Sequence, residues 1–290
     1  LMINPVQAVI KAPSREKMEE KIKGQKEALN RIENYLQTQS LSFVDKEVLE
    51  IGTYDGSSAY AFAELGAKRV VATDMAAYYI NQTPGGVVSD DAIAEKNIEL
   101  KETREAYSKV INKQNASKVS FVEDDICTSK VASESMDVIV SWEVLEHITN
   151  PNEAFKQMSR ILKKGGFAFH EYNPFFSVDG GHSLCTLDFP WGHARLTDAD
   201  FEKYVNEFRP NEKEVALSFF KNNLNRMTLS HLKDCMKENG LEPISIIPWY
   251  SHDDQGSLTI DMLNQCKNIH PTAEMVDLVA PIVWVLCKKK

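Results

Sequence analysis

Short apolar segments alternate with helical segments from Lys46 to Tyr172, and this alternation is the strongest constraint on the fold. The apolar segments, rich in valine and isoleucine, are KEVLEI, RVVATD, VSFVED, MDVIVSW and FAFHEY. Their length and composition are typical of strands, and the stretches between most of them have the composition of helices. Strands and helices in turn predict an α/β fold in which a parallel sheet is covered on both faces.

The chain around this alternation divides into four predicted parts. An amphipathic helix from Ser14 to about Gln39 is expected to cover the sheet, with Ser14 as its N-cap. The predicted parts are an N-terminal cover helix region at residues 1–45, a ligand-binding core at 46–172 with an insertion at 76–118, a lid insertion at 173–227, and a C-terminal part of the core sheet at 228–290.

Composition narrows the class of protein. With 290 residues and 43% hydrophobic content the chain can bury a full core, and its net charge of -9 opposes binding to nucleic acid or to an anionic membrane. The five cysteines are widely spaced without a CxxC pair, which favours a reducing compartment over a disulfide framework. Neither a signal peptide nor a membrane-spanning run is recognisable, so we expect a cytoplasmic protein without a membrane partner. Nothing indicates its oligomeric state.

The loop VLEIGTYDG, Val48–Gly56, follows the first predicted strand and is the first candidate site. In an open parallel sheet, ligands bind beyond the carboxyl ends of the strands. A dinucleotide fingerprint requires G-x-G-x-x-G, but here Tyr54 stands where the middle glycine would lie. Glu50 and Asp55 would also repel a pyrophosphate, so we expect a ligand that is neutral or cationic at this end.

Later strands end in further carboxylates. Asp74 suits the two hydroxyls of a ribose, and Asp125 with Ile126 could meet an adenine through a hydrogen bond and an apolar face. An adenosine that carries a positive sulfonium and an amino-acid tail would join these features. Two simpler interpretations stay open: Asp74 caps the following helix, or Asp124 takes the role of Asp125.

The segments VLEIGTYDG, VVATDM, VEDDI, DVIVSWEVLEHI and ILKKGGFAF, in this order, resemble the class I S-adenosylmethionine-dependent methyltransferases. The resemblance implies a Rossmann-like, seven-stranded, mostly parallel sheet with helices on both faces and an inserted substrate lid, and S-adenosylmethionine as cofactor. The cofactor-binding residues that it implies are Glu50, Gly52, Tyr54, Gly56, Asp74, Met75, Asp125, Ile126, Ser141 and Trp142. Tyr54 departs from the usual glycine or small residue, so we expect it to narrow the pocket or cover the cofactor.

The acceptor is expected beside the fifth strand and in the lid. Methyl transfer needs donor and acceptor held in line, and an oxygen acceptor benefits from a base. The residues predicted to be catalytic are His170, Glu171, His182 and His193, and those predicted to bind substrate are Tyr172, Asn173, Trp191, Arg195 and Arg226. Trp191 has a structural alternative as the filler of a packed corner. His147 lies next to the site as a possible base or a structural residue.

A divalent metal is possible but is not favoured, and no metal ligands are assigned. The residues that could hold it are His170, Glu171, Asp179, His182 and His193, but they lack a compact ligand spacing. The sequence therefore predicts methyl transfer to a small or medium-sized metabolite, with oxygen favoured over nitrogen or carbon. The alternatives are a nicotinamide-dinucleotide oxidoreductase on a similar sheet and a non-catalytic module that binds a nucleoside or a partner.

Overall fold

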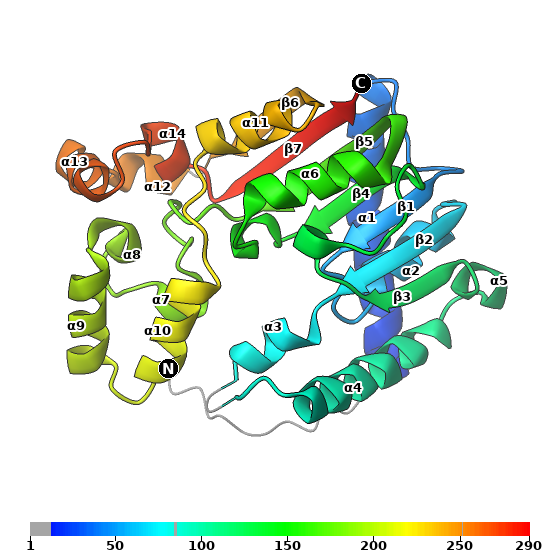
Figure 1. The fold of residues 1–290 in the computed structure, drawn as a ribbon, viewed down its shortest axis with the longest axis horizontal. Coiled ribbons are helices and arrows are strands. Elements are labelled where there is room, and N and C mark those ends of the chain that lie inside the picture. Colours follow the sequence, from blue (N-terminus) through cyan, green and yellow to red (C-terminus); the bar gives the residue numbers. More distant parts are fainter. Residues whose placement is uncertain (1–12, 84–85, 251) are drawn as a thin grey trace.

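The computed structural model describes residues 13–83, 86–250 and 252–290, whose strands form one seven-stranded sheet in the order β3-β2-β1-β4-β5-β7-β6 (Figure 1). Neighbouring strands among β1 to β5 pair in parallel, whereas β7 is antiparallel to both β5 and β6. The strands are β1 (Glu47–Ile51), β2 (Arg69–Asp74), β3 (Val119–Glu123), β4 (Met136–Trp142), β5 (Leu162–Tyr172), β6 (Leu241–Trp249) and β7 (Ile282–Lys289). The predicted seven-stranded, mostly parallel sheet is confirmed.

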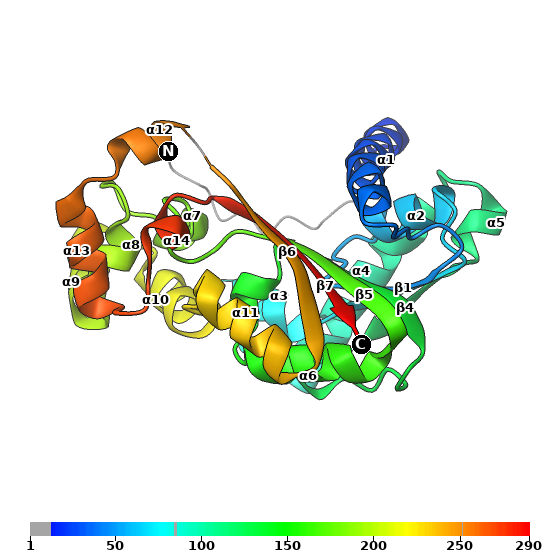
Figure 2. The same ribbon diagram turned by 90° about the horizontal axis from the view of Figure 1, so that it is seen from above.

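Helices cover both faces of the sheet (Figure 2). On one face lie α1 (Arg15–Thr38) and α2 (Ser57–Glu64), whose apolar residues share a core with β1, β2, β4 and β5. The Ser14 hydroxyl accepts a hydrogen bond from the backbone N–H of Lys17, which confirms the predicted cap. On the other face lie α6 (Pro151–Ile161) and α11 (Leu229–Glu238), packed over Ile139 and Ala168.

The boundary between α6 and β5 differs from the prediction. The sequence predicts a strand over FAFHEY, which begins at Phe167, but the helix ends at Ile161 and the strand begins at Leu162. Leu162 pairs with Met136 of β4, and Gly165 has a φ of 79° that a helix does not allow.

The predicted insertion between β2 and β3 carries three helices: α3 (Ala76–Asn81), α4 (Asp90–Ser108) and α5 (Lys113–Ala116). A buried cluster joins α4 to α1 and α2 through Tyr107, Ile22 and Tyr60. Single 3-10 turns, η1 (Ile126–Thr128) and η2 (Leu145–His147), follow β3 and β4.

The predicted lid contains α7 (His182–Cys185), α8 (Gly192–Arg195), α9 (Asp198–Phe208) and α10 (Lys213–Asn222). These helices share a core with α13 (Ile260–Ile269) and α14 (Met275–Leu278), which belong with α12 (His252–Ser257) to the long connection between β6 and β7. Figure 1 shows both groups of helices to the left of the sheet. The helical group that includes the predicted lid is therefore built from two distant parts of the sequence. Of the helices in the described ranges, none has the length and apolar character needed to cross a bilayer.

Candidate functional site

A cavity of about 620 Å³ opens between the strand ends and the lid. Its walls come from the loops after β1, β2, β3 and β4, and from the end of α10 at Asn222 and Asn223. The predicted cofactor residues that line it are Gly52, Tyr54, Asp74, Met75, Asp125, Ile126 and Trp142. Their contact with a cofactor stays a prediction.

The loop after β1 forms one wall, and three of its residues, Gly52, Tyr54 and Gly56, have left-handed backbone conformations. Gly52 has a φ of 74°, and a Cβ atom there would lie 2.4 Å from Cγ2 of Val144. Tyr54 has a φ of 50°, and its ring packs on the ring of Tyr79 with centroids 5.3 Å apart. Tyr54 lines the cavity and is 43% exposed, so its side chain lies at the mouth of the cavity and narrows it there.

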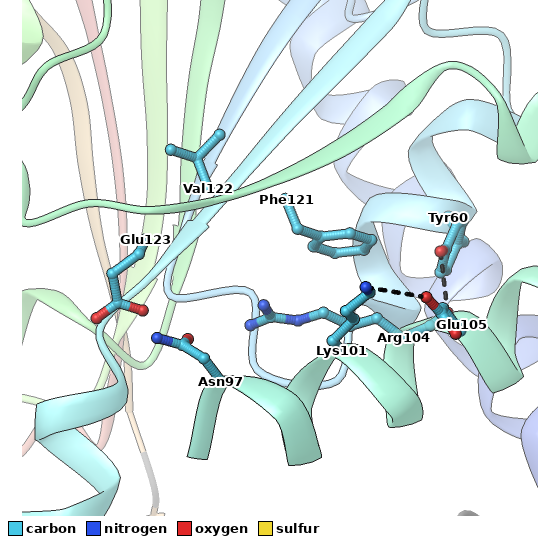
Figure 3. A pocket seen from close by; sticks show the side chains of 8 residues that line it. All are labelled: Tyr60, Asn97, Lys101, Arg104, Glu105, Phe121, Val122 and Glu123. Carbon is cyan, nitrogen blue, oxygen red and sulfur yellow. Dashed lines mark hydrogen bonds and ion pairs between the residues drawn. The ribbon is translucent and has the colours of Figure 1, made fainter. Parts of the chain in front are cut away.

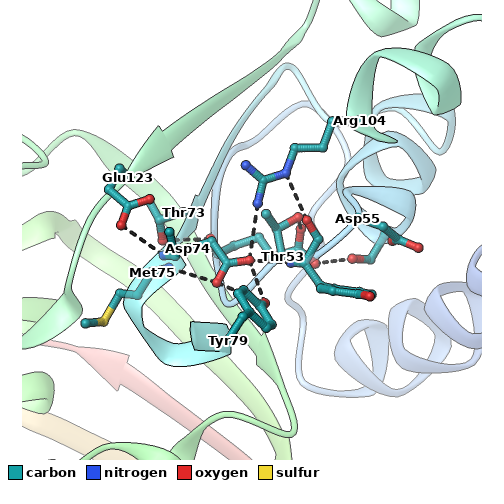
Figure 4. A network of polar contacts seen from close by, with 12 residues as sticks. Thr53, Asp55, Thr73, Asp74, Met75, Tyr79, Arg104 and Glu123 are labelled. Carbon is teal, nitrogen blue, oxygen red and sulfur yellow. Dashed lines mark hydrogen bonds and ion pairs between the residues drawn. The ribbon is translucent and has the colours of Figure 1, made fainter. Parts of the chain in front are cut away.

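Asp74 is the most heavily bonded carboxylate in the wall (Figure 4). One oxygen, Oδ2, accepts hydrogen bonds from the backbone N–H of Tyr54 at 2.6 Å, the hydroxyl of Tyr79 at 2.9 Å and Arg104 Nη2 at 3.2 Å. The other, Oδ1, accepts from the backbone N–H of Met75 at 2.8 Å. Burial raises the pKa of Asp74, while these donors act in the opposite direction. The carboxylate is thus held at one place in the cavity wall.

Asp124 and Asp125 both line the cavity, so the choice between them stays open. The carboxylate of Asp125 accepts a hydrogen bond from the backbone N–H of Cys127 and caps η1. Asp124 accepts from the backbone N–H of Lys130 at 2.8 Å. Ile126, the next residue along the chain, is buried and contributes an apolar side chain to the same cavity.

Three predicted cofactor residues support the site from behind. Glu50 is fully buried and accepts hydrogen bonds from Thr53, Ser58 and the indole N–H of Trp142; burial raises its pKa. Gly56 is the N-cap of α2, where an added Cβ would lie 2.6 Å from Cζ of Phe121. The hydroxyl of Ser141 is buried against Nδ1 of His170 at 2.7 Å. Glu50, Gly56 and Ser141 do not line the cavity in this structure, so their contact with a cofactor stays a prediction.

His170, Glu171 and His193, which were predicted to be catalytic, lie outside the lining of the cavity. His170 is fully buried beneath Phe155, and burial lowers its pKa to about 3. Glu171 accepts a hydrogen bond from the indole N–H of Trp284 on β7. His193 is buried with Nε2 2.7 Å from the carbonyl oxygen of Phe175. None of the three side chains lines the cavity, and each is held by a neighbour outside its wall, so their catalytic roles stay predictions.

The predicted substrate residues also lie outside the wall. Tyr172 is buried in the sheet core, and the side chain of Asn173 accepts a hydrogen bond from Ser177. The indole N–H of Trp191 donates to the carbonyl oxygen of Leu278, as its structural alternative required. The guanidinium groups of Arg195 and Arg226 are held by neighbouring residues. Arg195 donates to Gln265 and the Pro190 carbonyl, and Arg226 lies over Phe175 and Phe220 and donates to the carbonyls of Phe220 and Leu224.

Several residues that sequence reasoning missed line the cavity or support its wall. Among the missed residues in the wall are Tyr78, Tyr79, Gln82, Val144, Asn222 and Asn223; His147, which was expected next to the site, also lines it. Arg104 bonds Asp74 from α4, where it shares a buried helix face with Leu100 and Tyr107. A charged residue on an otherwise apolar helical face was the signal available in the sequence, because such a side chain requires a buried partner.

A cluster of one carboxylate and two imidazoles lies against this wall. Potential ligand atoms of Glu146, His147 and His182 all lie within 4.8 Å of one another. Burial raises the pKa of Glu146 to about 8 and lowers that of His147 to about 4; it also lowers the pKa of His182. Of the residues considered for a metal, only His182 belongs to this cluster; among the described residues, His170, Glu171, Asp179 and His193 form no such group.

A second hollow of about 420 Å³ lies between α4 and β3 (Figure 3). Phe121 and Arg104 form its floor, with the guanidinium carbon 4.8 Å from the ring centroid. The hydroxyl of Tyr60 donates to the carbonyl oxygen of Arg104 at its rim. None of the residues predicted from the sequence to bind cofactor or substrate lines it, so the larger cavity is the candidate active site.

Residues 16–246 match a family described as a methyltransferase domain. The chain belongs to this methyltransferase-domain family. The match confirms the resemblance to class I S-adenosylmethionine-dependent methyltransferases. It spans the loops that line the cavity and much of the lid.

Two solved structures share the fold of this methyltransferase domain at low sequence identity. A putative sarcosine dimethylglycine methyltransferase from Galdieria sulphuraria is 13% identical, with a TM-score of 0.51 over 91% of this chain and 87% of that one. An S-adenosylmethionine-dependent methyltransferase from Mesorhizobium loti is 10% identical, with a TM-score of 0.51 over 88% of this chain and 96% of that one.

One curated relative is the mitochondrial ubiquinone biosynthesis O-methyltransferase of Dictyostelium discoideum. It is 29% identical over 122 residues, which make up 42% of this chain. The matched region spans about a third (33%) of the length of that relative.

Proposed function

We propose that this chain transfers the methyl group of S-adenosylmethionine to an oxygen atom of a small or medium-sized metabolite. The observation that carries the proposal is the single cavity shared by the loops of a methyltransferase domain and the end of the lid. In it, Asp74 would hold the ribose hydroxyls, Asp125 or Asp124 with Ile126 the adenine, and Gly52 would leave room for the methionine part.

A small or medium-sized acceptor suits the size and apolar lining of the cavity. Methyl transfer is an in-line displacement, and holding both reactants in a water-poor pocket lowers its barrier. Aromatic and apolar groups from Tyr78, Val144 and Ile148 line the cavity together with Asp74. The acidic charge of the chain favours a metabolite over nucleic acid as the acceptor.

Oxygen is favoured over nitrogen and carbon because an oxygen acceptor has to lose a proton. Lowered pKa values keep His147 and His182 uncharged near neutral pH, so polar groups able to assist that loss stand beside the cavity. The likeness of part of the chain to an O-methyltransferase supports the same choice.

Incubation with isotopically labelled S-adenosylmethionine and a cell metabolite extract tests the proposal, with products identified by mass spectrometry. We expect a labelled methyl ether or ester. A labelled amine or carbon-methylated product would contradict oxygen transfer. Binding of S-adenosylmethionine without transfer to any metabolite would favour a non-catalytic module, and binding of a nicotinamide dinucleotide alone would favour an oxidoreductase.

A further inference from the structure

The three side chains of Glu146, His147 and His182 converge at the wall of the cavity from two separate segments. Glu146 and His147 end the turn after β4, and His182 begins α7 in the lid. The rings of His147 and His182 have centroids 4.9 Å apart. His147 itself lines the cavity, so the cluster stands where the lid meets the cofactor loops.

Glu146 and His147 each have one atom fixed by the backbone. Glu146 is completely buried, and its Oε1 accepts the backbone N–H of Asn173 at 3.1 Å. His147 Nδ1 lies 2.7 Å from the carbonyl oxygen of Asn223, which can only accept a hydrogen bond. Nδ1 therefore carries the proton, and Nε2 keeps its lone pair. A histidine that donates its other ring N–H to a carbonyl is held in the orientation typical of a metal ligand.

The remaining atoms of the cluster lack hydrogen bonds. Within the described ranges, Glu146 Oε2 and His182 Nε2 are buried and have no hydrogen-bond partner. Leaving such atoms unpaired costs about 1–3 kcal/mol each, more for a charged group. His182 also has a φ of 52°, a conformation that costs about 1–2 kcal/mol for a residue with a Cβ. Buried unpaired atoms and local strain at one place are features of a ligand site.

We propose that Glu146, His147 and His182 bind a divalent transition-metal ion that holds the acceptor hydroxyl. The ligand atoms would be Glu146 Oε2, His147 Nε2 and one ring nitrogen of His182. Bond lengths of about 2.0–2.2 Å place the ligand atoms of one ion roughly 3–3.5 Å apart. The potential ligand atoms of the cluster lie up to 4.8 Å apart, and small side-chain rotations would bring them to that separation.

The ligand set favours ions from the Mn²⁺ to Zn²⁺ series over Mg²⁺ or Ca²⁺, because imidazole nitrogen suits the former and all-oxygen sites the latter. Three protein ligands leave coordination positions for the acceptor. This role rests on the proposed methyl transfer: the ion lowers the pKa of the acceptor hydroxyl, whose proton leaves to solvent. The oxygen then bonds to the methyl carbon, the carbon–sulfur bond breaks, and its electron pair stays on sulfur as a neutral thioether.

Metal titration of the chelator-treated, dialysed full chain tests the site without any assay of activity. Zn²⁺ is titrated by calorimetry, and Co²⁺ by its visible absorption. We expect one equivalent to bind to the wild type, and Glu146→Gln and His182→Asn to weaken the affinity by more than about tenfold. Glu146→Gln keeps the shape of the side chain and an acceptor for Asn173. The matched control is His231→Ala on α11, outside the cluster, and it should bind as the wild type does.

Absence of stoichiometric binding to the wild type, or equal affinity in all four proteins, would overturn the proposal. Circular dichroism and urea unfolding show which variants are folded. If Glu146→Gln or His182→Asn is not folded, His147→Asn is tested in its place. S-adenosylmethionine is titrated into the same metal-free protein. If it fails to bind while the metal does, the proposed function fails and the metal site stands; the reverse result removes the metal site alone.

Discussion

Replacement of Gly52 by alanine should destabilise the protein by two separable effects. The φ of 74° costs about 1–2 kcal/mol for a residue with a Cβ. The new Cβ would also lie 2.4 Å from Cγ2 of Val144, and relief of such overpacking costs about 1–3 kcal/mol. The free energy of unfolding should therefore fall by about 2–5 kcal/mol, and S-adenosylmethionine should bind more weakly because the displaced Val144 lines the cavity.

Gly165→Ala is the matched control, because Gly165 has a φ of 79° and no atom within 4 Å of an added Cβ. It should lose only the backbone contribution of about 1–2 kcal/mol and keep its cofactor affinity. In urea unfolding, Val144→Ala combined with Gly52→Ala should recover part of the difference between the two glycine variants, as a coupling of about 0.5–3 kcal/mol. Equal losses in Gly52→Ala and Gly165→Ala, or no coupling with Val144, would refute the close approach of the two loops.

Three further predictions concern other parts of the site and its support. Asp74→Asn should weaken S-adenosylmethionine binding in calorimetry by about tenfold to a hundredfold. Asp55→Asn, in the loop after β1 but outside the cavity wall, should leave the affinity unchanged. Equal effects of the two substitutions would contradict the ribose assignment of Asp74. Burial lowers the pKa of His170 from 6.5 to about 3. Below pH 6.5 the unfolded chain therefore binds more protons at this residue than the folded chain does. The free energy of unfolding should fall by about 2 kcal/mol from pH 7 to pH 5. Urea unfolding of His170→Gln should show a shallower decline over this range, and an unchanged decline would contradict the buried, uncharged ring. Trp191→Phe should leave the carbonyl oxygen of Leu278 unpaired and lower the unfolding free energy by about 1–3 kcal/mol without changing cofactor affinity; a change in affinity alone would indicate a ligand contact.

The cofactor side of the site could be predicted because its signals are local. Strands, and the loops directly after them, carry Gly52, Asp74 and Asp125, and parallel strands bring their carboxyl ends to one edge. The long insertion was expected to hold an additional element, yet the contact of Arg104 with Asp74 depends on the packing of α4 against the sheet. That packing has no signature in the residues near Asp74.

The acceptor side could not be predicted, because burial there depends on tertiary packing. β5 is central and buried over most of its length, so its sequence lacks the alternation that would show which face His170 occupies. The lid core includes α13 and α14 from the β6–β7 connection, and this packing buries Trp191 and His193. Glu146 and His147 lie in a motif that the resemblance linked to the cofactor core, while their neighbour His182 lies in the predicted lid.

Calorimetric titration of S-adenosylmethionine into the wild-type chain is the most direct test of the candidate site. We expect one binding site per chain, competition by S-adenosylhomocysteine, and loss of binding in Asp74→Asn but not in Asp55→Asn. No heat with S-adenosylmethionine together with saturable binding of NADH, or S-adenosylmethionine binding that Asp74→Asn leaves unchanged, would contradict the assignment of this cavity as the methyl-donor site.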